Sequence, residues 1–168
     1  EVIVHLYEEM GERCVERLNG MFAFAIWDER QQRMVLARDR LGQKPLHYAL
    51  TGEGLTFASE IPPILEDPAV EREIELRALH QYLRLKYVPG PLTMFNGVNK
   101  LPPAHMMICE NGHASLEQYW DVDYSRKLNL TEEEWEERVL ALLQDAVRLR
   151  LVTDMPLGAL LSGGIDSS

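Results

Sequence analysis

The sequence predicts an α+β protein in which antiparallel hairpins and helices are followed by the start of an α/β unit. Over residues 21–120, most strand-like runs come in pairs joined by short turns, with no helix between the two members of a pair. Residues 131–161 instead predict one long helix and a short apolar strand, and a turn rich in glycine and serine follows. The polar residues 126–130 between these parts predict a linker.

The first elements are a helix and two hairpins. Residues 2–18 predict one amphipathic helix, because apolar side chains recur on one face at helical spacing. The apolar runs 21–27 and 33–38 flank a polar turn and predict a pair of strands. The runs 46–50 and 55–58 flank a turn that contains two glycines, and they predict a second hairpin.

The middle of the chain predicts a charged helix and a third hairpin. Residues 75–85 place leucine and tyrosine side chains on one face of the helix, and a Pro-Gly-Pro segment at 89–91 then breaks the chain. Strands over 105–110 and 115–120 flank Asn111-Gly112, a dipeptide that is typical of hairpin turns.

The last long helix has a clear start signal. Thr131 and Glu134 have the spacing of a capping box, in which each side chain bonds the backbone of the other residue. Five apolar side chains then recur on one face, which we expect to point toward a core: Trp135, Val139, Leu142, Leu143 and Ala146. The apolar run 157–161 predicts one buried strand.

Composition excludes several classes of protein. The chain has 168 residues, 46% of them apolar, and a formal net charge of −10. This acidic balance argues against binding to nucleic acid, which needs clustered Lys and Arg. No apolar run approaches the ~20 residues that cross a bilayer, so we expect no membrane association. The first residue is Glu1 and not Met, so we expect the natural start to lie upstream.

The cysteines and histidines show no metal-ligand spacing. Cys14, on the apolar face of the first helix, and Cys109, in a predicted strand, favour packed thiols in a reducing, cytoplasmic setting. The five histidines are scattered, and we expect surface or packing roles for them. Glu60 precedes a short segment, where it either caps a helix or orders a domain interface.

The residues after the last apolar run carry the sharpest functional signal. Ser162-Gly163-Gly164-Ile165-Asp166-Ser167 predicts a turn that opens a helix. Glycines there let the backbone approach an anion, and the N–H groups at the start of a helix attract phosphate. The segment is not a Walker A loop, because no Gly-Lys-Ser or Gly-Lys-Thr follows. A plain glycine turn is the alternative interpretation.

This loop resembles the pyrophosphate-binding loop of the ATP-pyrophosphatase (PP-loop) family. The resemblance implies that the parent protein binds ATP and Mg²⁺, with Asp166 beside the metal and Leu160 at the adenine. It also implies that four residues bind the pyrophosphate: Ser162, Gly163, Gly164 and Ser167.

Five blocks upstream resemble the class II glutamine amidotransferases. They are Gly-Met-Phe-Ala-Phe-Ala-Ile-Trp-Asp at 20–28, Ala-Arg-Asp-Arg-Leu-Gly-Gln-Lys-Pro-Leu at 37–46, Ala-Ser-Glu at 58–60, Tyr-Val-Pro-Gly-Pro at 87–91 and Lys-Leu-Pro-Pro-Ala-His at 100–105. In this order, and followed by the phosphate loop, they are similar to the glutamine-hydrolysing asparagine synthetase family. The resemblance implies the C-terminal part of an N-terminal-nucleophile (Ntn) hydrolase sandwich over 1–125, a linker at 126–130 and the start of a PP-loop domain at 131–168.

The family resemblance implies an enzyme with two sites that uses glutamine, aspartate and ATP, and it allows a homodimer. One site releases ammonia from glutamine, and the other forms β-aspartyl-AMP, which ammonia converts to asparagine. The family's N-terminal cysteine is absent here and Cys14 lacks a free α-amine, so we expect this chain alone to be inactive. Two alternatives remain, namely an amide-forming relative that resembles β-lactam synthetase, and a non-catalytic scaffold domain.

Overall fold

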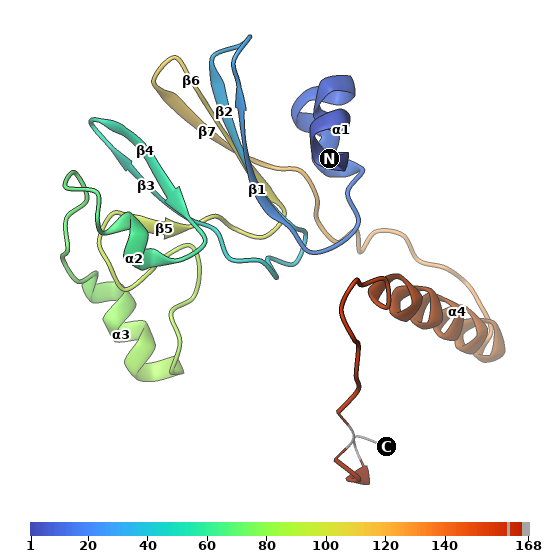
Figure 1. The fold of residues 1–168 in the computed structure, drawn as a ribbon. Coiled ribbons are helices and arrows are strands. Elements are labelled where there is room, and N and C mark those ends of the chain that lie inside the picture. The colour runs from blue at the N-terminus through green and yellow to red at the C-terminus, as the bar shows by residue number, and fades with distance from the viewer. Residues whose placement is uncertain (161, 166–168) are drawn as a thin grey trace. The chain divides into compact units, whose positions relative to one another are not determined.

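A computed structural model describes residues 1–160 and 162–165, and residues 161 and 166–168 lie outside the described part. The chain divides into two compact units, Glu1–Val122 and Asp123–Ser168. The first unit contains two β-sheets with helices, and the second contains one long helix (Figure 1). Among the described residues, no helix is long and apolar enough to cross a bilayer.

Two antiparallel sheets form the centre of the first unit (Figure 1). One has the strand order β1-β2-β6-β7 and consists of β1 (Ala23–Asp28), β2 (Arg33–Arg38), β6 (His105–Glu110) and β7 (His113–Gln118). The other has the order β4-β3-β5 and consists of β3 (His47–Thr51), β4 (Gly54–Ala58) and β5 (Val98–Lys100). The mixed α+β class and the three predicted hairpins are therefore confirmed.

Neighbouring side chains of β2 enter different cores, because successive residues of a strand point to opposite faces of the sheet. Ala37 packs against the N-terminal helical segment in a cluster with Cys14, Val15 and Met106. Leu36 packs between the two sheets in a cluster with Leu46, Leu101 and Met107. A third cluster joins the second sheet to α2 (Ile61–Ile64) and contains Ala49, Ile64, Val70 and Val98. The layers of the first unit thus follow the order helix, sheet, sheet, helix.

The single helix predicted over residues 2–18 is wrong in its middle. Helix α1 (Val2–Met10) ends at Gly11, which has φ +62° and ψ −145°, and the 3₁₀ helix η1 (Gly11–Glu16) follows. A positive φ is cheap for glycine because it has no Cβ, so Gly11 redirects the chain. The redirected segment buries Cys14 and Val15 against the sheet.

The two longest helices begin at side-chain caps. Before α3 (Leu76–Leu85), the Glu75 carboxylate accepts a hydrogen bond from the Arg77 N–H at 3.0 Å. At the start of α4 (Glu132–Arg150), the Glu134 N–H donates to Thr131 Oγ1 at 3.3 Å. The Thr131 N–H donates to Glu134 Oε2 at 2.8 Å, which confirms the predicted capping box.

Helix α4 buries none of its residues in the second unit. All five side chains that we expected to point toward a core are exposed in the described structure. The strand predicted over 157–161 is wrong for residues 157–160, which are irregular and exposed, and Leu161 lies outside the described residues. A strand needs a partner for its backbone hydrogen bonds, and the described part of the second unit offers none.

Candidate functional site

A buried carboxylate organises the loop after β2, which we call the Asp39 loop (residues 38–44). Asp39 has no exposed surface, and its side chain accepts hydrogen bonds from four backbone N–H groups. The donors and their distances are Phe22 at 3.3 Å, Leu41 at 3.2 Å, Gln43 at 3.0 Å and Lys44 at 2.9 Å. This single side chain therefore fixes the whole turn of the amidotransferase-like block at 37–46.

The environment of Asp39 keeps it ionised. Burial by itself would raise the pKa of this carboxyl, but the backbone hydrogen bonds outweigh burial and hold the pKa below its ordinary value. Because its oxygens are already engaged by these donors, Asp39 is suited to hold the backbone and not to transfer protons.

Arg38 ties the Asp39 loop to a distant part of the chain. Its guanidinium donates to the carbonyl oxygens of Lys44 at 2.7 Å, Leu101 at 2.6 Å and Gly42 at 2.6 Å. The Tyr119 hydroxyl donates to the Arg38 carbonyl at 2.7 Å, and burial raises the pKa of Tyr119 to about 12. The blocks at 37–46 and 100–105 are therefore parts of one structural unit.

Gly42 is required at its place in this loop. It has φ +63°, and a Cβ there would lie 2.8 Å from the Pro103 ring and 3.1 Å from the Arg38 guanidinium. Both the backbone conformation and the space therefore select glycine at this position of the block.

Three of the amidotransferase-like blocks meet at one cavity of about 470 Å³, which we call the proline-walled cavity. Its lining consists of Arg38, residues 87–91, Lys100, Pro102 and Pro103. The Lys100 ammonium donates a hydrogen bond to the Val88 carbonyl at 2.5 Å. Sequence reasoning missed this cavity, because residues separated by up to 65 positions line it, from Arg38 to Pro103.

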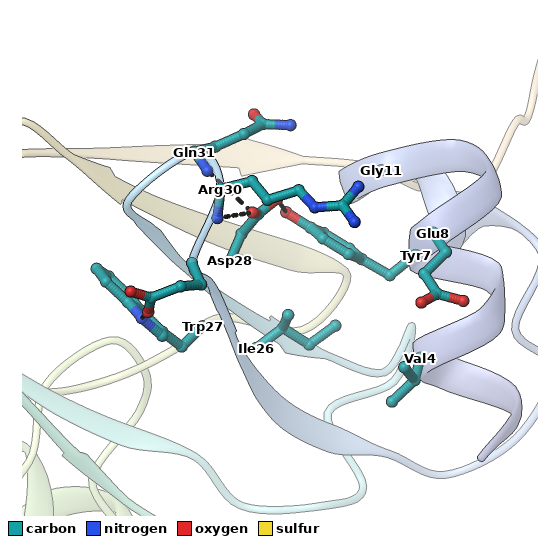
Figure 2. Close-up of a pocket in the computed structure, with 10 residues that line it drawn as sticks. Val4, Tyr7, Glu8, Gly11, Ile26, Trp27, Asp28, Arg30 and Gln31 are labelled. Carbon is teal, nitrogen blue, oxygen red and sulfur yellow. Dashed lines mark hydrogen bonds between the residues drawn. The ribbon is translucent and has the colours of Figure 1, made fainter.

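A second cavity, of about 550 Å³, lies between α1 and the end of β1 (Figure 2). The Tyr7 hydroxyl donates to Asp28 Oδ2 at 3.1 Å and accepts from Arg33 Nε at 3.2 Å. Arg33 Nη2 also donates to Glu12 Oε2 at 2.7 Å. The Asp28 side chain accepts two backbone N–H groups of its own turn as well. The polar groups beside this cavity therefore join the N-terminal helical segment to the β1–β2 hairpin, and its described lining contains no cysteine or serine.

Neither cysteine has the surroundings of a nucleophile. Cys14 is buried, which confirms the prediction of a packed thiol, and burial raises its pKa. Cys109 on β6 is half-buried beside the cluster between the sheets, and burial raises its pKa too. A raised pKa keeps a thiol protonated and unreactive. Glu60 is the N-cap residue of α2, but its side chain makes no capping hydrogen bond, so that predicted role is wrong.

The predicted pyrophosphate loop is described only in part. Leu160 is fully exposed, Gly163 has φ +71°, and the Gly164 N–H donates to Ser162 Oγ at 3.4 Å. Asp166 and Ser167 lie outside the described residues. Within the described part of the chain, no three His, Cys, Asp or Glu side chains converge on a metal position. The predicted contacts of this loop with ATP and Mg²⁺ stay predictions.

Comparisons with known proteins divide the chain in two. A family model described as "Glutamine amidotransferase domain" matches residues 1–120, and one described as "Asparagine synthase" matches residues 138–168. A glutamine-hydrolysing asparagine synthetase of Bacillus subtilis is 39% identical over the whole chain, which covers 27% of that relative. A putative one from Methanocaldococcus jannaschii is 36% identical, with 33% covered.

A relative with another name is nearly as similar. Amidase chry2 of Gibberella zeae is 38% identical over the whole chain, which covers 25% of that protein. The chain thus spans only a quarter to a third of the length of these curated relatives. Because the amidotransferase model matches most of the chain, in the region that the Asp39 loop organises, this chain belongs to the glutamine amidotransferase family.

Proposed function

We propose that the chain is part of a glutamine-hydrolysing asparagine synthetase. The supporting observation is the order of its parts: the amidotransferase match, in which the buried Asp39 holds a loop, precedes the asparagine synthase match at 138–168. In this proposal residues 1–125 belong to an Ntn-type glutaminase domain, 126–130 form a linker and 131–168 begin a PP-loop domain. The helix-sheet-sheet-helix layering of the first unit supports the glutaminase assignment.

The proposed glutaminase reaction takes its nucleophile from outside these 168 residues. Cys14 and Cys109 have raised pKa values and pack against apolar side chains. The family resemblance implies an N-terminal cysteine as the nucleophile, with its α-amine as the base, and in this proposal the 168 residues alone hydrolyse no glutamine. The described chain instead supplies the scaffold, with Asp39 and Arg38 holding the loop after β2.

The proposed synthetase reaction activates aspartate with ATP, because a carboxylate is a poor acyl donor until its oxygen becomes part of a good leaving group. Ser162, Gly163, Gly164 and Ser167 would bind the pyrophosphate, and Leu160 the adenine. A carboxylate oxygen is a preferred ligand of Mg²⁺, so Asp166 would hold the metal, which neutralises phosphate charge when bound. The positive φ of Gly163 supports a backbone that can approach phosphate closely.

The proposal also includes a cellular location and an oligomeric state. Both cysteines are free thiols, which supports a reducing, cytoplasmic location. A homodimer is part of the proposal, and sedimentation of the full-length protein tests it.

A second candidate is an amide-forming enzyme of the same architecture with another acid substrate. This candidate is supported by similarity to two relatives that are named amidases. They are Amidase chry2, at 38% identity, and Amidase chyE of Penicillium rubens, at 36% identity. Assaying the full-length protein with aspartate and with other carboxylic acids separates the two candidates. A coding sequence that begins Met-Cys-Gly upstream supports both of them, whereas an unrelated start would indicate a non-catalytic scaffold.

Substitutions in the predicted phosphate loop test the separation of the two sites. In the full-length protein, we expect Gly163→Val or Asp166→Ala to lower asparagine synthesis at least about 100-fold, the size of effect seen when a group that stabilises developing charge is lost. Glutaminase activity should stay near that of the parent. Gly52→Val is the matched control, because Gly52 has no positive φ and open space around it. Equal loss of both activities would contradict the separate roles.

A further inference from the structure

The proline-walled cavity carries positive charge in a chain whose net charge is −10. Arg38 and Lys100 are both half-buried in its lining, and none of the described residues that line it is Asp or Glu. Among the ion pairs of the described residues, neither cation has a carboxylate within 4.0 Å. The ionised carboxylate of Asp39 acts on Arg38, but only burial and the charge of Arg38 shift the pKa of Lys100. A charge that is partly removed from water without a counter-ion is costly, so an anion beside Lys100 would offset that cost.

Both cations keep donors that are not used by the protein bonds described above. A guanidinium has five N–H donors and Arg38 gives three of them to carbonyl groups, while an ammonium has three and Lys100 gives one to Val88. His47 pairs with Lys100 across β3 and β5, but burial and the two nearby cations lower its pKa, which favours the neutral ring, so it adds no charge to the cavity. Its ring Nδ1 lies 3.1 Å from the Ser59 carbonyl oxygen.

The walls of the cavity are apolar. Four prolines, Tyr87 and Val88 form most of them, and a proline has no N–H to donate. The volume of about 470 Å³ lies within the usual range of about 300–1,000 Å³ for small-molecule sites. Such walls suit a hydrocarbon body attached to the anionic group.

We propose that the proline-walled cavity binds a small organic carboxylate that has an apolar body and no amino group. The carboxylate lies against Lys100 and Arg38, and the body packs on the prolines and Tyr87. We expect α-amino acids to bind more weakly, because their ammonium would lie close to two cations and the described lining offers it no carboxylate. This inference does not depend on the proposed function.

Burial lowers the pKa of Lys100, with the nearby Arg38 charge acting in the same direction. A bound carboxylate would reverse this by favouring the charged ammonium. Salt screens an ion pair that is partly exposed. We therefore expect the bound carboxylate to be held more weakly as ionic strength rises.

Calorimetric titration of the full-length protein with 3-phenylpropanoate tests the proposal. Two probes are matched to it: 3-phenylpropanamide removes the charge, and phenylalanine adds the α-ammonium. We expect the carboxylate to bind at least about tenfold more tightly than either, a difference of about 1.4 kcal/mol. Absence of carboxylate binding, or equal binding of the amide or of phenylalanine, would overturn the proposal.

Variants then locate the site. Lys100→Met keeps most of the aliphatic stem and should weaken 3-phenylpropanoate binding about tenfold, whereas Lys100→Arg should restore most of it. Lys127→Met, at an exposed lysine of the second unit, is the control and should bind like the parent. Unchanged binding in Lys100→Met would overturn the proposal. If Lys100→Met fails to fold, the comparison of the three probes on the parent protein still decides.

Discussion

The two units of the chain are held together in different ways. In Glu1–Val122, residues far apart in sequence share cores on both sides of the first sheet, and Arg38 bonds a carbonyl group at Leu101. In Asp123–Ser168, the described structure is one helix with a local capping box and no buried residue. The matched blocks of the first unit thus make tertiary contacts with one another, whereas the described part of the second unit has only local contacts.

This difference sets what substitutions should do. In the first unit, removal of one buried group disturbs several elements, because the same residues contact more than one of them. In the second unit, a substitution on α4 should have effects confined to the helix. Hydrogen exchange of backbone amides resolves the two units separately, which a single global unfolding curve does not.

The largest effect is expected for Asp39→Ala. The substitution leaves four backbone N–H groups without their acceptor, and each unsatisfied donor costs free energy. We expect the free energy of opening of the β2 amides to fall by about 4 kcal/mol, since not all donors can be rescued by water. Asp154→Ala, at an exposed carboxylate of the second unit, is the control and should leave these amides unchanged.

The same carboxylate should make the first unit sensitive to acid. The pKa of Asp39 is lower in the folded protein than the unfolded value of about 3.9. Its contribution is therefore fully present above that value and is lost as the pH falls through the lower, folded pKa. In Asp39→Asn, protection of the β2 amides should depend less on pH below about 4. An identical acid profile in parent and variant would show that Asp39 is not the group responsible.

A matched pair of leucine substitutions contrasts the units directly. Leu36 is 0% exposed between the two sheets, whereas Leu143 on α4 is 58% exposed. Leu36→Ala should lower the stability of the first unit by about 3 kcal/mol through lost burial and a cavity. Leu143→Ala should change stability by less than about 0.5 kcal/mol. If both variants lost similar protection of their own units, the apolar face of α4 would have to be buried in solution.

The smallest effect is expected for Thr131→Ala. Loss of the capping hydrogen bond to Glu134 should destabilise the first turn of α4 by about 1 kcal/mol. Exchange should become faster at the first amides of α4 and stay unchanged in β2 and β6. Faster exchange in the sheets would mean that α4 supports the first unit.

Much of this fold could be predicted because its signals are local. Asn111-Gly112 and the glycine-containing turn before β4 define hairpins within a few residues, and Thr131 with Glu134 defines a helix start. The spacing of apolar residues favoured a continuous helix, but α1 ends at Gly11. The positive φ of Gly11 could not be predicted from that spacing. The apolar run 157–160 is a strand only where a partner strand is present.

The site was harder to predict than the fold, because its contacts join residues that are far apart in the sequence. Arg38 and Asp39 belong to a recognisable block, but their contacts with Leu101 and Phe22 depend on how distant segments pack. The proline-walled cavity also arises only when the segments 87–91 and 100–103 meet. The predicted phosphate residues are adjacent in sequence, so the pattern alone was enough to suggest their role.

The central claim is that an amidotransferase unit and the start of an ATP-pyrophosphatase unit serve one asparagine-forming enzyme. The direct test is phosphorus NMR of the full-length protein during turnover with ATP, aspartate and glutamine. The account predicts AMP and pyrophosphate, formed together with asparagine and glutamate. Release of ADP and inorganic phosphate, or no nucleotide turnover while asparagine still forms, would contradict it.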